Sequence, residues 1–230
     1  MDDFLVDGRG TSEFGARLLA KYSVGGVSIE RQRVQPAQGL HFIPCATRLG
    51  LKEITLPVHV YGATPRQAQE RKSALDAALL ADPVELALPD GFLYRASLDK
   101  IGETTELSVD GCILEGSYTL SGCRHDLPET VTLPAGGGTL YARGTAPDME
   151  CRITCTVGAA ADSYLMAGIL WVDVEAGDVL VLDGIRRAVT CNGANALNQC
   201  DLTRWPLLAP GLNALTAPDA LTVEYCPVYL

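Results

Sequence analysis

Apolar and polar residues alternate in short stretches along most of the chain. Residues 54–60 place four aliphatic side chains on one face, and residues 221–225 alternate Leu, Val and Tyr with Thr and Glu. Alternation with a period of two is typical of a strand that packs on one side and meets water on the other. By the same pattern we expect strands at residues 26–34, 84–88, 93–98, 113–121, 139–142, 151–157, 169–174, 178–182 and 188–191. The chain is therefore predicted to be mainly β.

One segment has the signals of a helix instead. Thr64 is a suitable N-cap, Pro65 suits the first helical position, and Gln67 three residues after the cap completes a capping box. The predicted helix covers residues 64–81 and ends before Pro83, because the residue before a proline avoids the helical region. One face carries the apolar side chains and the other faces water: Ala68, Leu75, Ala78 and Leu79 on the first, Arg66, Glu70 and Lys72 on the second.

A polar, proline-bearing stretch followed by a run of glycines separates two halves. Residues 124–129 are mostly polar, and residues 134–138 read Pro-Ala-Gly-Gly-Gly. We expect a first domain at residues 1–126, a linker at 127–134 and a second domain at 135–230. The first is predicted to be a β-barrel or sandwich with one α-helix, and the second a β-sandwich, because it holds six or more short strands separated by turn signals.

A sharp turn is expected before the last predicted strand. Pro210 and Gly211, followed by Asn213, favour a tight reversal, since proline fixes φ while glycine and asparagine tolerate positive φ. Pro227 then prevents the strand at residues 221–225 from extending. The second domain is thus expected to close with this strand.

Composition excludes some classes of function. The chain has 230 residues, 47% of them hydrophobic, and a formal net charge of −10. Nucleic-acid-binding domains usually carry a basic patch, and here the basic residues are dispersed. No apolar run approaches the roughly 20 residues that span a bilayer, and the first residues do not resemble a signal peptide. We expect neither nucleic-acid nor membrane binding, and no export by a signal peptide.

Eight cysteines are spread over the chain without a CxxC pair. Without a signal peptide the reducing cytoplasm is the expected compartment of synthesis, and the cysteines are interpreted as free thiols. Cys151 and Cys155 lie close in sequence, but the three histidines do not have the spacing of zinc ligands. We expect no metal and no cofactor.

Three strings in the second half occur in a characteristic order. Gly-Asp followed by apolar residues (177–183) precedes Asn-Gly (192–193), and then comes Trp-Pro-Leu-Leu-Ala-Pro-Gly-Leu-Asn (205–213). After a β-domain with a single helix, this order resembles siphophage distal tail proteins. The resemblance implies a structural protein of the virion tail tip, assembled in the cytoplasm of the host bacterium. It also implies that the second domain is galectin-like.

The same resemblance implies the partners. The first domain would form a homo-hexameric ring between the major tail tube protein and the tail-tip hub protein. DNA would pass through the ring without being bound, and a negatively charged lumen would suit that passage because it repels phosphate. The resemblance leaves open another tail subunit of similar fold.

The sequence gives little support for a set of catalytic residues. Ser163 with His125 and Asp126, or the paired acids Asp173 and Glu175, are the candidates, but no nucleophile elbow, HExxH pair or phosphate loop accompanies them. We expect the two acids to lie on the solvent face of a strand whose apolar face carries Val172 and Val174. The chain is predicted to have no catalytic residues and not to be an enzyme.

A carbohydrate-binding module that contributes to host recognition is the alternative from another class. An exposed indole can stack on a sugar ring, and Trp171 and Trp205 are the two tryptophans. Trp171 lies in an apolar run and is expected in the core. Trp205, between Arg204 and Pro206, is the candidate sugar-binding residue, although the sequence shows no dense set of polar residues around it.

Overall fold

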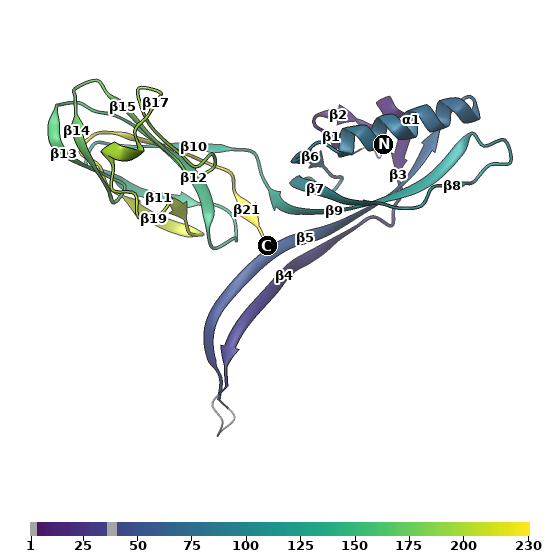
Figure 1. The fold of residues 1–230 in the computed structure, drawn as a ribbon, viewed down its shortest axis with the longest axis horizontal. Coiled ribbons are helices and arrows are strands. Elements are labelled where there is room, and N and C mark those ends of the chain that lie inside the picture. Colours follow the sequence, from purple (N-terminus) through teal and green to yellow (C-terminus); the bar gives the residue numbers. More distant parts are fainter. Residues whose placement is uncertain (1–3, 36–40) are drawn as a thin grey trace. The chain divides into compact units, whose positions relative to one another are not determined.

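The protein is mainly β, as predicted, and the computed structural model describes residues 4–35 and 41–230. It divides into two compact units, one up to Arg124 together with Leu230 and one from His125 to Tyr229. Figure 1 shows the elements of each unit.

The first unit is built on one antiparallel sheet. Its strands follow the order β2-β1-β6-β7-β9-β5-β3, with β4 beside β5 and β8 beside β9. Their bounds are β1 (Leu5–Val6), β2 (Arg9–Gly10), β3 (Ala16–Leu18), β4 (Ser23–Val34), β5 (Ile43–Tyr61), β6 (Val84–Ala87), β7 (Leu93–Ile101), β8 (Thr105–Glu106) and β9 (Ile113–His125), and a 3-10 turn η1 covers Thr11–Phe14.

The helix α1 (Pro65–Leu79) forms as the sequence predicts. Gln67 N–H donates to the Thr64 hydroxyl oxygen at 3.2 Å, and Ala63 N–H donates to the Gln67 Oε1 at 2.6 Å. Figure 1 shows α1 running along one face of the sheet. Leu75 and Leu79 are buried in the core of this unit with inward-facing residues of β5, β6 and β9.

Lys72 is an exception to the predicted helix faces. It was expected to face water, but only 4% of the residue is exposed. Its Nζ lies 2.6 Å from the Asp76 Oδ1 and 4.9 Å from the centre of the Tyr118 ring. A Cβ on Gly116 would lie 3.0 Å from the Lys72 Cε, so this glycine provides space for the stem. The charge is buried because the sheet supplies partners for it, which the helical pattern could not show.

The strands β4 and β5 form a hairpin much longer than the sequence predicts. Strands were expected at residues 26–34 and 54–60, whereas β5 begins at Ile43. From Lys52 to Tyr61, β5 pairs with β9 on its other side, but residues 43–51 pair only with β4 within the described structure. This part of the hairpin, between residues 27 and 51, is called the outer hairpin. Its described residues therefore form a two-stranded ribbon. Period-two alternation did not reveal it because neither of its faces is buried.

The second unit is a β-sandwich. One sheet has the order β10-β20-β12-β15-β16-β17 with β18 beside β12, and the pairs β11-β19 and β13-β14 complete the unit. The bounds are β10 (Glu129–Leu133), β11 (Gly138–Ala142), β12 (Met149–Thr156), β13 (Ala161–Met166), β14 (Ile169–Val174), β15 (Val179–Asp183), β16 (Ala188–Cys191), β17 (Ala194–Asn195), β18 (Leu207–Leu208), β19 (Gly211–Leu215), β20 (Leu221–Tyr225) and β21 (Val228–Tyr229), with a 3-10 turn η2 at Leu197–Gln199.

The segment expected as a linker, residues 127–134, contains a strand of this sandwich. Along its whole length β10 pairs with β20, from Glu129 opposite Tyr225 to Leu133 opposite Leu221. Leu133 is buried in the core of the second unit. The proline and polar residues around it resemble a linker locally, but an edge strand tolerates both.

Trp171 is fully buried at the centre of the sandwich core, as the sequence predicts. The prediction for its neighbours Val172 and Val174 was wrong, because Val174 is buried and Val172 is 39% exposed. Between them Asp173 has a φ of 52°, in the left-handed region. This residue interrupts the alternation and turns the two valines to different sides.

Candidate functional site

A hollow of about 400 Å³ opens in the second unit beside Trp205. Buried residues of β12, Cys151 and Ile153, line it from the inside. Its other walls are residues 147–148 before β12, the turn at 167–168 with the first residue of β14, the segment 203–209, and residues 213–215 of β19.

Two local features hold the segment 203–209 in place. A Cβ on Gly184 would lie 2.9 Å from the Cys151 carbonyl oxygen and 3.0 Å from that of Pro206, so the glycine permits this close approach. At the other end, Asn213 accepts a hydrogen bond from Ala209 N–H at 2.9 Å and donates to the Ala209 carbonyl oxygen at 2.7 Å. The segment is thus held at two points that follow its aromatic residue, Pro206 and Ala209.

The predicted reversal lies between Ala209 and Asn213, but it leads into a strand that the sequence did not predict. Gly211 has a φ of 93° and begins β19, which pairs with β11. The strand β20 at Leu221–Tyr225 follows as expected, and a short strand β21 comes after it.

Trp205 is half-buried and lines the hollow. The Arg187 guanidinium carbon lies 5.5 Å from the centre of its ring. Arg187 also forms an ion pair with Glu150, and neither residue lines the hollow. The guanidinium therefore packs over the indole without lining the cavity, a contact that restrains the ring.

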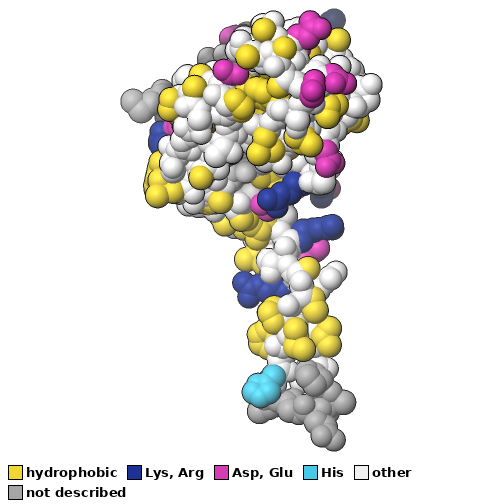
Figure 2. Space-filling model, turned by 90° about the vertical axis from the view of Figure 1, so that its left-hand side faces the viewer, with side chains coloured by type: hydrophobic (Ala, Val, Ile, Leu, Met, Phe, Trp, Pro, Cys, Tyr) yellow, Lys and Arg dark blue, Asp and Glu magenta, His cyan; other side chains and the backbone are white. Residues whose placement is uncertain are grey.

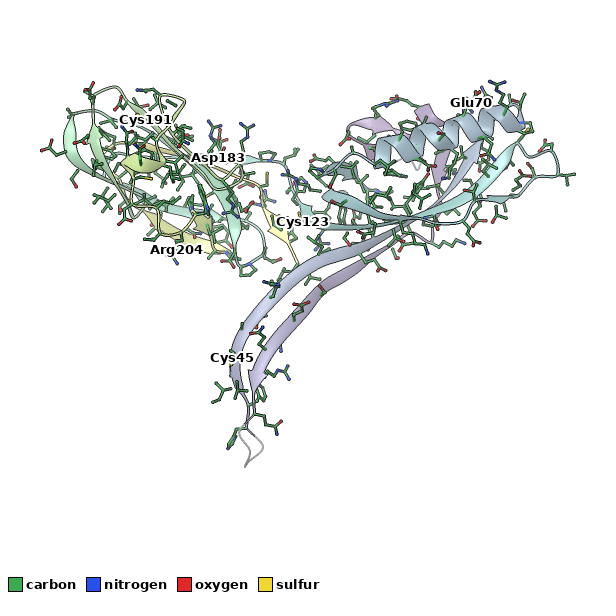
Figure 3. The ribbon with its side chains drawn as sticks, viewed as in Figure 1. Cys45, Glu70, Cys123, Asp183, Cys191 and Arg204 are labelled. Atoms are coloured by element: carbon green, nitrogen blue, oxygen red, sulfur yellow. The ribbon has the colours of Figure 1, made fainter. Side chains whose placement is uncertain are left out.

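Two exposed charged residues on the rim have no partner among the described residues. In the described structure, Asp148 and Arg204 take part in no hydrogen bond or ion pair through their side chains, and both line the hollow. Other arginines of this unit, Arg143, Arg152 and Arg187, each pair with a glutamate. Figure 3 labels Arg204, which lies on the side of the unit where β11 and β19 run.

The catalytic candidates are not assembled into a site. Ser163 lies on β13 opposite Val172, and its hydroxyl has no hydrogen-bond partner among the described residues. His125 ends β9, and its Nδ1 lies 2.9 Å from the Asp126 carbonyl oxygen. Glu175 follows Asp173 in a turn closed by Asp178, whose carboxylate accepts from Glu175 N–H. No arrangement of these groups supports a shared proton transfer.

The cysteines are thiols in the structure, and none of the eight forms a disulfide. Burial raises the pKa of the Cys151 thiol to about 12, and burial also raises the pKa of Cys155. Such thiols are poor nucleophiles at neutral pH because the thiolate is scarce. Within residues 4–35 and 41–230, no group of three or more His, Cys, Asp or Glu is arranged to hold a metal ion.

None of the helices in the described part of the chain has the length and apolar character needed to cross a membrane.

Residues 147–229, which include the hollow, match the family model described as the C-terminal domain of siphovirus-type tail components. The second unit is thus similar to this tail component domain over most of its length. This confirms the resemblance to siphophage distal tail proteins that the strings between residues 177 and 213 indicated. No curated protein matches the chain.

Solved structures share the fold of the tail component domain together with that of the first unit. A crystal structure of the SPP1 Dit protein, described as a paradigm of hub adsorption apparatus in phages that infect Gram-positive bacteria, matches with a TM-score of 0.78 at 16% identity over 99% of both chains. A chain of the phage P2 baseplate in its activated conformation with Ca matches with a TM-score of 0.52 at 8% identity, over 95% of this chain and 92% of that one. A chain of the same baseplate with Sr matches with a TM-score of 0.51 at 9% identity, over 96% of this chain and 97% of that one.

Proposed function

We propose that this chain is the ring-forming structural subunit of a siphophage distal tail. In this proposal the first unit forms a homo-hexamer between the tail tube protein and the tail-tip hub protein, and the second unit contacts neighbouring baseplate components. The tail component domain and the fold shared with SPP1 Dit and baseplate proteins support a structural role at the tail tip. They also favour a subunit without catalytic activity.

The outer hairpin is the feature that best supports the proposal of a ring. It is a two-stranded ribbon, and isolated ribbons of this kind are only marginally stable in water. Five of its large apolar side chains are more than half exposed: Ile29, Val34, Phe42, Ile43 and Leu51. Figure 2 shows hydrophobic side chains along the ribbon with Lys and Arg between them. A contact with another protein would bury this surface.

The charge of the hairpin favours a second copy as that protein. Residues 27–51 hold Arg31, Arg33 and Arg48 against a single Glu30, while the whole chain carries a net charge of −10. A basic, apolar ribbon on an otherwise acidic molecule is complementary to the rest of its neighbour. Because the ribbon and its acceptor would be different surfaces, the contact is heterologous, and a heterologous contact forms a ring when its repeated rotation closes.

The exposed Cys45 on β5 gives a direct test (Figure 3). A benzophenone coupled to Cys45 is photolysed with the tail tube protein present, and the products are sized by denaturing electrophoresis and imaged by negative stain. We expect a ladder that ends at the hexamer and six-fold rings. Ile43→Asp should abolish both, because it places a charge in the buried contact.

The matched control uses Val109, an exposed residue of the same unit outside the hairpin. Val109→Asp should leave the ladder unchanged, and a label on Val109→Cys in a Cys45→Ser background should give a weaker one. A stable two-fold dimer formed through the second unit would contradict the proposal.

A further inference from the structure

We propose that the hollow beside Trp205 is a binding site for a neutral saccharide. This goes beyond the structural role of the ring, since it gives the second unit a ligand of its own. The inference stands on three features of the hollow: an indole on its wall, two unpaired charges on its rim, and its size.

The indole offers an apolar surface at the edge of a polar opening. Trp205 is half-buried and lines the hollow, so part of its ring is exposed there. Arg187, which does not line the hollow, stacks on the same ring. The C–H face of a pyranose ring is apolar and packs well on an aromatic ring. The clamp formed by Asn213 and the contact at Gly184 hold this segment before the ligand arrives. A fixed indole loses little entropy on binding.

The rim supplies both kinds of hydrogen-bonding group that sugar hydroxyls need. The Asp148 carboxylate accepts hydrogen bonds and the Arg204 guanidinium donates them, and neither is engaged elsewhere in the described structure. Thr203, also on the rim, adds a hydroxyl that does both. Hydrogen bonds to charged groups are stronger than neutral ones.

The same pair of charges selects against anions. A phosphate or carboxylate near Arg204 would also lie in the field of Asp148, and the second unit holds twelve acidic residues against five basic ones. A neutral ligand avoids this repulsion. The volume of about 400 Å³ is at the small end of ligand pockets, which suits one or two sugar units.

The test measures binding of methyl glycosides of glucose, galactose and mannose, and of N-acetylglucosamine and N-acetylgalactosamine, to the full chain. Sodium glucuronate and glycerol 3-phosphate are the anionic comparisons. Saturation-transfer NMR reports contact, and tryptophan fluorescence reports stacking, because Trp171 is buried and Trp205 is not. We expect at least one neutral saccharide to saturate the site with a Kd near 1 mM, in the range usual for a small ligand with few contacts.

Variants then locate the binding. Trp205→Ala should weaken it by more than about tenfold, and Asp148→Asn and Arg204→Met by about fivefold each. The last two residues are exposed, so these variants keep the fold even if the first does not. Tyr141→Ala is the matched control, since Tyr141 is 68% exposed and lies outside the hollow. It should leave the affinity unchanged.

Three results would overturn the proposal. The first is the absence of saturation with every neutral saccharide up to about 50 mM. The second is a Kd that does not change in Asp148→Asn and Arg204→Met. The third is tighter binding of glucuronate or glycerol phosphate than of any neutral saccharide.

Discussion

At the residue scale, two ion pairs on α1 show how burial determines what an ion pair contributes to stability. Arg66 and Glu70 form a pair whose side chains are 89% and 62% exposed, and Lys72 and Asp76 form one whose side chains are 5% and 26% exposed. Both have the spacing i, i+4. The second pair also accepts a hydrogen bond from the Tyr118 hydroxyl at 2.6 Å, so it ties the helix to the sheet.

Removing Lys72 should therefore cost far more than removing Arg66. Lys72→Ala leaves the Asp76 carboxylate partly buried without its cation and should lower the free energy of unfolding by about 3 kcal/mol. Arg66→Ala, the control on the same helix, should leave it nearly unchanged because exposed pairs contribute little. Denaturant unfolding followed by circular dichroism at 222 nm, which reports on α1, measures both. Equal effects of the two variants would show that the buried pair has no special role.

The same cluster predicts a dependence on alkaline pH. Burial, and then the hydrogen bond to Asp76, raise the pKa of Tyr118 well above its usual range. The folded pKa exceeds the unfolded value of about 10, so the stabilisation is complete below pH 10 and is lost as the pH rises above it. Each such tyrosine lowers the free energy of unfolding by about 1.4 kcal/mol per pH unit in that window.

Tyr118→Phe should make this decline shallower by that amount between pH 10 and about 11.5. The measurement is the helical signal in denaturant titrations under reducing conditions. Both tryptophans lie in the second unit, so their fluorescence follows that unit and serves as an internal control that should not change. An unchanged slope of the helical signal would contradict the role given to Tyr118.

At the element scale, the outer hairpin of β4 and β5 lies outside the hydrophobic core of the first unit. None of its described residues, 27–35 and 41–51, belongs to the buried cluster of the first unit. Its length is fixed by cross-strand pairing from Val27 opposite Lys52 to Val34 opposite Ile43. The described residues of the hairpin thus add no side chain to the buried core of this unit.

Shortening the hairpin should leave the first unit folded. Because Val27 and Lys52 face each other, residues 28–51 can be replaced by Asn-Gly, the preferred two-residue turn between paired strands. We expect the helical unfolding transition to keep its midpoint, while rings no longer form with the tube protein. Loss of the helical transition in this variant would show that the hairpin is needed for the fold.

At the scale of the whole molecule, β10 decides where the second unit begins. It pairs along its whole length with β20 and contributes Leu133 to the core. The division of the chain near His125 leaves β10 inside the second unit. A start at residue 135 would remove an edge strand and a buried leucine together.

Two fragments test this division. Residues 125–229 should unfold in one cooperative transition, whereas residues 135–229 should be less stable by at least about 3 kcal/mol, the cost of losing a buried leucine and exposing its cavity. Tryptophan fluorescence in denaturant measures both fragments. Equal stability would show that β10 contributes nothing to the stability of the second unit. Residues 127–134 would then act as the linker that the sequence predicts.

The comparison of sequence with structure separates local from distant causes. The cap at Thr64, the burial of Trp171 and the strand at residues 221–225 all follow from residues within a few positions of one another, and the sequence predicts each of them. Such features depend on backbone preference and on the period of apolar residues. The candidate Trp205 also came from the sequence, as an aromatic residue beside a charged one.

The tertiary structure alone decided the rest, because each case depends on a partner distant in the chain. Lys72 is buried since Tyr118, on a strand far along the sequence, lies beside it. Residues 43–51 form a strand only because β4 pairs with them. Asp148 reaches the hollow of Trp205 because β12 and the segment 203–209 pack together, and no short-range pattern records that contact. Local preferences determine which elements form, whereas packing determines which side chains meet.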